Sequence, residues 1–221
     1  FAGLILYGLF IGLGFMLQED VIVLLMAVTF LLSLTFRPRY LSPAFVIFLT
    51  ATVVIFLPEL ETTITWWHEW LAGIQIGSLP YLFLLMAAFL FVEAMLIMFQ
   101  AKRKPSPRKV VGKRGKAIGG FKTERVWLVP TFLLIPGFGL ERIEWWPFFG
   151  SGDSFAFMLV PFLIGYDQFQ TYDLPDRALK RDGTRLALVA FTALPLAVLA
   201  FLYDWLLTAF LGMAVLCFSR F

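Results

Sequence analysis

Long apolar runs separated by short polar breaks make up most of the chain. A helix needs roughly 20 apolar residues to cross a bilayer, and fewer when flanking side chains reach the interface. Breaks such as residues 18–20 and Asp204 fit tight turns, because a charge must leave the hydrocarbon. The pattern therefore predicts eight membrane-spanning helices, at residues 1–17, 21–36, 41–57, 80–100, 126–140, 153–166, 186–203 and 205–218.

Composition favours the same class of protein. Of the 221 residues, 60% are hydrophobic and 15% are charged, and the mean hydropathy is +0.85. Soluble domains have about 45–50% apolar and about 25% charged residues. We expect an all-α, polytopic membrane protein with one transmembrane domain over residues 1–221. Both ends of the chain lie in or beside apolar runs, so we expect it to be a membrane region taken from a longer protein.

The distribution of Lys and Arg orients the predicted helices. If the loop 101–125 is cytoplasmic, alternation of the spans places 37–39, 167–185 and 219–221 on the same side. These segments hold 17 of the 18 basic residues, and the remaining one is Arg142. Cytoplasmic loops of membrane proteins are enriched in Lys and Arg. The sorting predicts cytoplasmic ends, and within 167–185 we expect a short surface helix that ends at Gly183.

Tryptophan is concentrated in two predicted external segments, 64–74 and 142–153. Indole rings prefer the headgroup level of a membrane. The segment 64–74 is also amphipathic, which favours a short helix on the outer surface. We expect five interfacial anchors, namely Trp66, Trp67, Trp70, Trp145 and Trp146.

The stretch PSPRKVVGKRGKAIGG (105–120) is strongly basic and lies between apolar runs. Its prolines and glycines disfavour a helix. Gly112 and Gly115 are too close for a phosphate-binding G-x-x-x-x-G-K loop, and the absence of interleaved aromatic residues disfavours nucleic-acid binding. Each Lys or Arg near an anionic leaflet contributes about 1 kcal/mol to the free energy of membrane binding. We expect a solvated loop that binds anionic lipid or a partner through Lys102, Arg103, Lys104, Arg108, Lys109, Lys113, Arg114 and Lys116.

The sequence contains no recognisable catalytic or metal-binding pattern. The single histidine, His68, begins HEWLA, whereas a zinc protease needs a second histidine where Ala72 stands. Asp153 and Asp167 would lie about 21 Å apart along a helix, too far to share a proton as a catalytic pair. We expect a protein that is not an enzyme and that has no metal or cofactor.

Glu93 is the only charged residue inside a predicted span. An intramembrane carboxylate commonly marks a proton or ion path, but it can also be protonated or paired across helices. Glu93 therefore motivates an alternative function, a small-molecule or ion transporter, beside a purely structural role.

Five segments in order, 34–45, 106–120, 125–137, 145–152 and 157–166, resemble the membrane region of the MinJ family of cell-division topological determinants. The resemblance implies a non-enzymatic scaffold that links the polar protein DivIVA to the MinD division inhibitor and so positions the septum. It implies a multi-pass plasma-membrane protein at septa and poles, with a cytoplasmic PDZ domain following Phe221. The expected partners are the lipid bilayer with its anionic lipids and DivIVA-like and MinD-like proteins, whereas self-association stays open.

Overall fold

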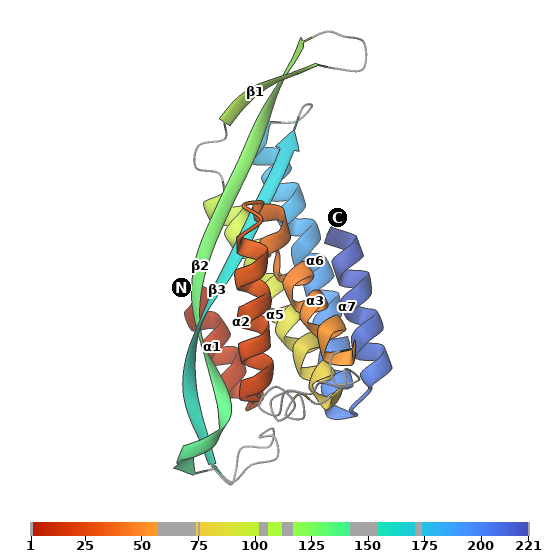
Figure 1. The fold of residues 1–221 in the computed structure, drawn as a ribbon. Coiled ribbons are helices and arrows are strands. Elements are labelled where there is room, and N and C mark those ends of the chain that lie inside the picture. The colour runs from red at the N-terminus through yellow and green to blue at the C-terminus, as the bar shows by residue number, and fades with distance from the viewer. Residues whose placement is uncertain are drawn as a thin grey trace.

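The computed structural model describes residues 2–56, 74, 76–101, 106–111, 117–141, 154–170 and 174–220. A bundle of helices packs against a long antiparallel ribbon of strands (Figure 1). The helices are α1 (Ala2–Leu13), α2 (Glu19–Ser33), α3 (Pro43–Phe56), α5 (Leu79–Gln100), α6 (Pro175–Leu202) and α7 (Leu206–Arg220), with 3-10 turns η1 (Pro38–Leu41) and η3 (Ile76–Ser78). The strands are β1 (Ser106–Val111), β2 (Ala117–Glu141) and β3 (Ser154–Gln170), in the order β1-β2-β3.

The all-α, eight-span prediction is wrong, because the segments 126–140 and 153–166 are strands. They belong to β2 and β3, which pair antiparallel from Phe121↔Gln170 to Glu141↔Ser154. Side chains of β2 alternate between the two faces: Thr123, Val129, Thr131 and Leu133 are buried, whereas Glu124, Val126, Leu128 and Phe132 are exposed. Because apolar residues occupy both faces, the strand has the continuous hydrophobic run of a membrane helix, and run length alone cannot separate the two.

Prolines supply the physical reason for strands in this region. Pro130 lies opposite Pro161 in the register of β2 and β3. Neither residue has an N–H, so the two must form a pair without hydrogen bonds between them. The backbone groups of the even-numbered residues around Pro130 consequently point away from β3, and Pro136 follows the same parity. In a helix interior each proline would cost about 3 kcal/mol, whereas an edge strand accommodates them.

Only two helices of the described residues are long and apolar enough to cross a membrane, judged by length and composition. They cover Ile76–Gln100, which is η3 with α5, and α6 at Pro175–Leu202, whereas α1, α3 and α7 are shorter apolar helices. This finding overturns the polytopic description of the chain. In α5, 78% of the apolar window is buried inside the fold, but in α6 only 28% is buried. The first helix is thus the core of the bundle, and the second lies at its surface.

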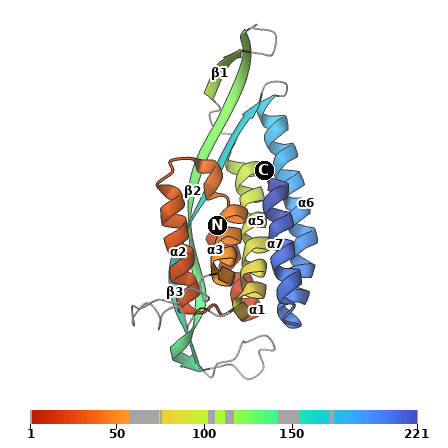
Figure 2. The ribbon, with the colours of Figure 1, turned by 45° about the vertical axis from the view of Figure 1, so that its right-hand side comes forward.

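The described parts of the basic segment, residues 106–111 and 117–120, are paired strands rather than an irregular loop. β1 pairs antiparallel with the start of β2, from Ser106↔Lys122 to Val111↔Ala117. Pro107 lies opposite Phe121 in a pair whose two residues do not hydrogen-bond to each other. The missing N–H of the proline therefore removes no hydrogen bond from the ladder. The paired strands extend beyond the ends of the helices (Figure 2). The short helix expected before Gly183 is also wrong in its bounds, because α6 runs without a break from Pro175 to Leu202.

A glycine sets the distance between β3 and the turn that precedes α3. A Cβ atom at Gly165 would overlap the backbone carbonyl of Pro38 and would also reach the Cβ of Leu41. The close approach of η1 to the strand therefore requires a residue without a side chain.

We predict that Gly165→Ala lowers the free energy of unfolding by about 1–3 kcal/mol, the usual cost of overpacking. Gly119→Ala is the matched control in the same sheet, because a Cβ at Gly119 meets nothing within 4 Å. Denaturant unfolding of both variants measures the difference. Equal stability of the two variants would contradict the packing seen at Gly165.

Candidate functional site

Positive charge gathers at one end of the molecule. α2 and α7 end there, α6 begins there, and the β1–β2 hairpin projects from it (Figure 1). Among the described residues, the opposite end of the molecule carries Glu19, Asp20, Glu141 and Asp204 and no Lys or Arg. Within the described ranges, the Lys and Arg residues all lie at the first end, called the basic end below: Arg37, Arg39, Arg108, Lys109, Lys122, Arg125, Arg177, Lys180, Arg181, Arg185 and Arg220.

A buried carboxylate is held at the basic end. Glu93 on α5 has no exposed surface. Its Oε1 atom accepts hydrogen bonds from Nη2 of Arg220 at 2.8 Å and from Nε at 3.1 Å, and its Oε2 atom accepts one from Oγ of Ser42 at 3.1 Å. Both oxygens of the carboxylate therefore have partners, and the charge is neutralised by a guanidinium.

Three helices position these groups. Glu93 lies on the buried face of α5, Arg220 is the last residue of α7, and Ser42 immediately precedes α3. The guanidinium of Arg220 also lies over the ring of Tyr166 from β3, with 5.4 Å between Cζ and the ring centroid. This distance is within the range of a cation–π contact. Arg220 thus joins α7 to both the core helix and the sheet.

Tyr166 extends the cluster to α6. Its hydroxyl hydrogen is shared between Oε1 of Gln168 and Oδ2 of Asp182, the latter at 3.4 Å. Burial raises the pKa of the Tyr166 hydroxyl well above its usual range, and the Asp182 carboxylate raises the pKa further. The hydroxyl is therefore a neutral donor at physiological pH.

A cavity of about 440 Å³ adjoins the cluster. Its polar lining comes from Gln168, Asp182, Arg185, Ser219 and Arg220. Within the described residues no group of three or more His, Cys, Asp or Glu side chains could hold a metal ion. The chemistry of the cluster is that of an internal ion pair and hydrogen-bond network, which fixes elements to one another.

The structure brings one predicted site residue, Glu93, into this cluster. Arg108 and Lys109 are exposed on β1. The other predicted lipid-binding or partner-binding residues and the predicted anchors lie outside the described residues: Lys102, Arg103, Lys104, Lys113, Arg114, Lys116, Trp66, Trp67, Trp70, Trp145 and Trp146. Sequence reasoning missed Ser42, Tyr166, Asp182 and Arg220. The usable signal was Arg220, a cation directly after an apolar run, which could neutralise the one carboxylate inside another run.

Comparison with known proteins places the chain beside a division protein. It is 27% identical over 205 residues to the cell division topological determinant MinJ of Bacillus subtilis (strain 168). The chain is similar to MinJ. The match covers 91% of this chain but 51% of MinJ, so the chain spans about half the length of that relative. No family model matches the chain, and no solved structure matches it.

The relationship confirms the resemblance to MinJ found in the five sequence segments. Because the alignment covers 91% of the chain, it includes most of both the helical bundle and the β2–β3 ribbon. The name of that relative describes a topological determinant of cell division.

Proposed function

We propose that this chain is the membrane-attached part of a non-enzymatic, MinJ-like adaptor that helps to position the division septum. The observation that carries the proposal is the similarity to MinJ over 91% of the chain. In this proposal the adaptor links a DivIVA-like polar scaffold to a MinD-like inhibitor, and it acts in the plasma membrane at septa and poles.

The surface of α6 supports attachment to a membrane. The helix is long enough to cross a bilayer, and most of its apolar window lies at the surface of the fold. Leu188, Phe191 and Leu199 on α6 are 61%, 69% and 43% exposed, and Val215 and Phe218 on α7 are 67% and 77% exposed. An apolar face of this extent needs a cover of lipid or protein. Lipid fits best, because the basic end would then lie at the anionic cytoplasmic leaflet.

The basic end supports binding of anionic lipid or a division protein. Arg108 and Lys109 are exposed on β1, which projects beyond the helices. Near an anionic leaflet each of these two side chains would contribute about 1 kcal/mol to the free energy of membrane binding. Transport through Glu93 has less support, because this carboxylate is fully buried and both of its oxygens accept hydrogen bonds from Arg220 or Ser42.

Deletion of the full-length protein in its own organism tests the adaptor function. We expect elongated cells with misplaced septa, and we expect a fluorescent fusion of the full-length protein to concentrate at septa and poles. Two-hybrid assays with DivIVA-like and MinD-like proteins measure the proposed links. Normal cell length in the deletion strain, together with an even distribution of the fusion, would refute the proposal.

A further inference from the structure

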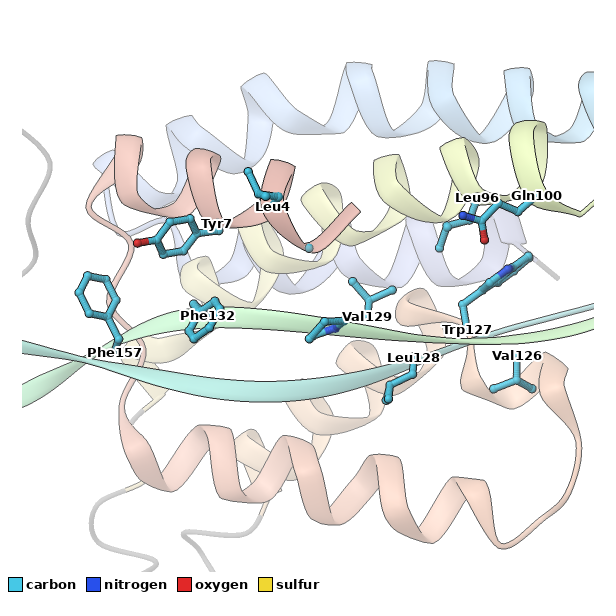
Figure 3. Close-up of a pocket in the computed structure, with 12 residues that line it drawn as sticks. Leu4, Tyr7, Leu96, Gln100, Val126, Trp127, Leu128, Val129, Phe132 and Phe157 are labelled. Carbon is cyan, nitrogen blue, oxygen red and sulfur yellow. The ribbon is translucent and has the colours of Figure 1, made fainter. Parts of the chain in front are cut away.

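A second cavity, of about 820 Å³, lies along β2 between the ends of α1 and α5 (Figure 3). Leu4 and Tyr7 of α1 and Leu96 and Gln100 of α5 form its helical walls. Residues 126–130 of β2 form a continuous part of the lining, and Gly3 of α1, Phe132 of β2 and Phe157 of β3 complete it. A wall made of consecutive strand residues includes side chains of both faces, so the cavity follows the edge of β2 along 126–130. It reaches a face of the sheet only at Phe132 and Phe157.

The edge of β2 in the cavity is a strand edge with free backbone groups. Because Pro130 and Pro161 oppose each other without hydrogen bonds, the N–H and C=O groups of Val126 and Leu128 point away from β3. The same parity explains why Leu134 offers its carbonyl to the N–H of Leu17 at 2.9 Å. Within the part of the chain that the structure describes, no other segment bonds to the backbone of Val126 or Leu128 on that edge.

Other segments of the chain already pair with this edge on both sides of the cavity. β1 occupies it up to the pair Ser106↔Lys122. Met16 forms a parallel bridge to Leu134 at the other side. The backbone carbonyl of Pro130 is covered by α1 at Gly3, where a Cβ would overlap it. Among the described residues, the run without a partner on this edge is therefore 123–129, about 20 Å of strand at about 3.3 Å per residue, which is the length of an ordinary strand.

We propose that this edge binds an extended peptide segment of a partner protein, which adds to the sheet between β1 and the Met16 bridge. The N–H and C=O groups of Val126 and Leu128 would bond to the peptide backbone. Alternate apolar side chains of the peptide would lie against Leu128 on one face and Val129 on the other, which Figure 3 shows on opposite sides of the strand. Main-chain bonds give affinity in such complexes, and alternate side chains give selectivity.

The charge near the cavity indicates the composition of the peptide. Arg125 lies on the same face of β2 as Trp127, one strand repeat nearer the basic end, and Trp127 lines the cavity. Arg108 and Lys109 of β1 lie further along the same edge. A segment with Asp or Glu at the end facing Arg125, followed by alternating apolar residues, would complement this edge.

A lipid chain fits the same cavity less well. Hydrocarbon offers no partner to the backbone groups of Val126 and Leu128, and each unsatisfied group would cost several kcal/mol. A peptide strand satisfies these groups and buries the same apolar walls. The inference concerns this edge alone and does not depend on the septal role proposed above.

Proline substitution tests strand addition directly. Leu128→Pro removes a donor from the free edge but none from the β2–β3 ladder, because residue 128 shares the parity of Pro130. Leu159→Pro is the matched control: Leu159 is 54% exposed and its backbone faces the outer edge of β3 by the same rule. Circular dichroism and thermal melting establish that both variants are folded. Should Leu128→Pro unfold, Val126→Pro replaces it at the next free-edge position.

The probe is a fluorescent peptide, Glu-Val-Thr-Val-Thr-Val, titrated with the detergent-solubilised chain and followed by anisotropy. We expect saturable binding to the wild type and to Leu159→Pro, and binding at least tenfold weaker to Leu128→Pro. A peptide with proline at its fourth position should also bind at least tenfold more weakly. The Arg125→Glu substitution should weaken the binding of this probe and strengthen the binding of a probe that begins with Lys.

Four results would overturn the proposal. The first is no binding of the probe to the wild type up to millimolar concentration. The second is equal loss of binding in Leu128→Pro and Leu159→Pro. The third is quenching of Trp127 fluorescence by a brominated phospholipid that also displaces the probe, because the cavity would then hold lipid. The fourth is a dimer, measured by light scattering, that Leu128→Pro dissociates, because the edge would then bind a second copy.

Discussion

Replacement of Arg220 by alanine is expected to lower the free energy of unfolding by about 3–5 kcal/mol, the usual effect of removing one partner of a buried ion pair. The carboxyl group of Glu93 would remain in a site with no exposed surface, with only the Ser42 hydroxyl as a donor. The contact of Arg220 with Tyr166 would be lost as well. Denaturant unfolding monitored by circular dichroism measures the change.

Two further variants isolate the ion pair. Arg177→Ala removes an exposed cation at the start of α6, at the same end of the molecule, and should change stability by less than about 0.5 kcal/mol. The double variant Glu93→Leu/Arg220→Leu removes both charges and should be closer to the wild type than Arg220→Ala alone, because apolar pairs replace buried ion pairs at little cost. If Arg220→Ala is as stable as Arg177→Ala, Glu93 does not depend on Arg220 for its neutralisation.

The sequence predicted some elements of this fold and not others, for physical reasons. The apolar run at 80–100 predicted α5 within one residue at its start, because a buried helix is apolar on all sides. The runs at 126–140 and 153–166 have the same apolar content, yet they form β2 and β3. Their prolines and their β-branched and aromatic residues were the signals for strands, and run length outweighed those signals in the prediction.

The candidate site was predictable only in part. A carboxylate inside an apolar run needs a partner, and this reasoning drew attention to Glu93. Its partners come from residues 42 and 220, which are 51 and 127 positions away in the chain. Such contacts depend on how the helices pack, and a single sequence contains no periodicity that reports them. The free edge of β2 could likewise not be predicted from the sequence, because it depends on the register that places Pro130 opposite Pro161.

An aspartate in the apolar face of α6 is expected to reduce membrane binding by more than about 100-fold. Phe191 is 69% exposed and lies in the apolar half of the helix. Replacement of Phe by Asp near the centre of a membrane helix costs about 3–4 kcal/mol. The measurement is the fraction of the chain that remains with liposomes containing anionic lipid after a high-salt wash, which removes purely electrostatic binding.

The matched control is Leu174→Asp on the same helix. Leu174 is 62% exposed but stands at the N-cap position, next to the basic end and outside the apolar half. Asp is a favourable N-cap residue, so this variant should fold and should bind liposomes like the wild type. Retention of Phe191→Asp at the wild-type level would mean that lipid does not cover α6, and the exposed face would then require a protein cover. If both variants lose binding to the liposomes, the cause is charge repulsion from the anionic surface, and neutral liposomes would restore their binding.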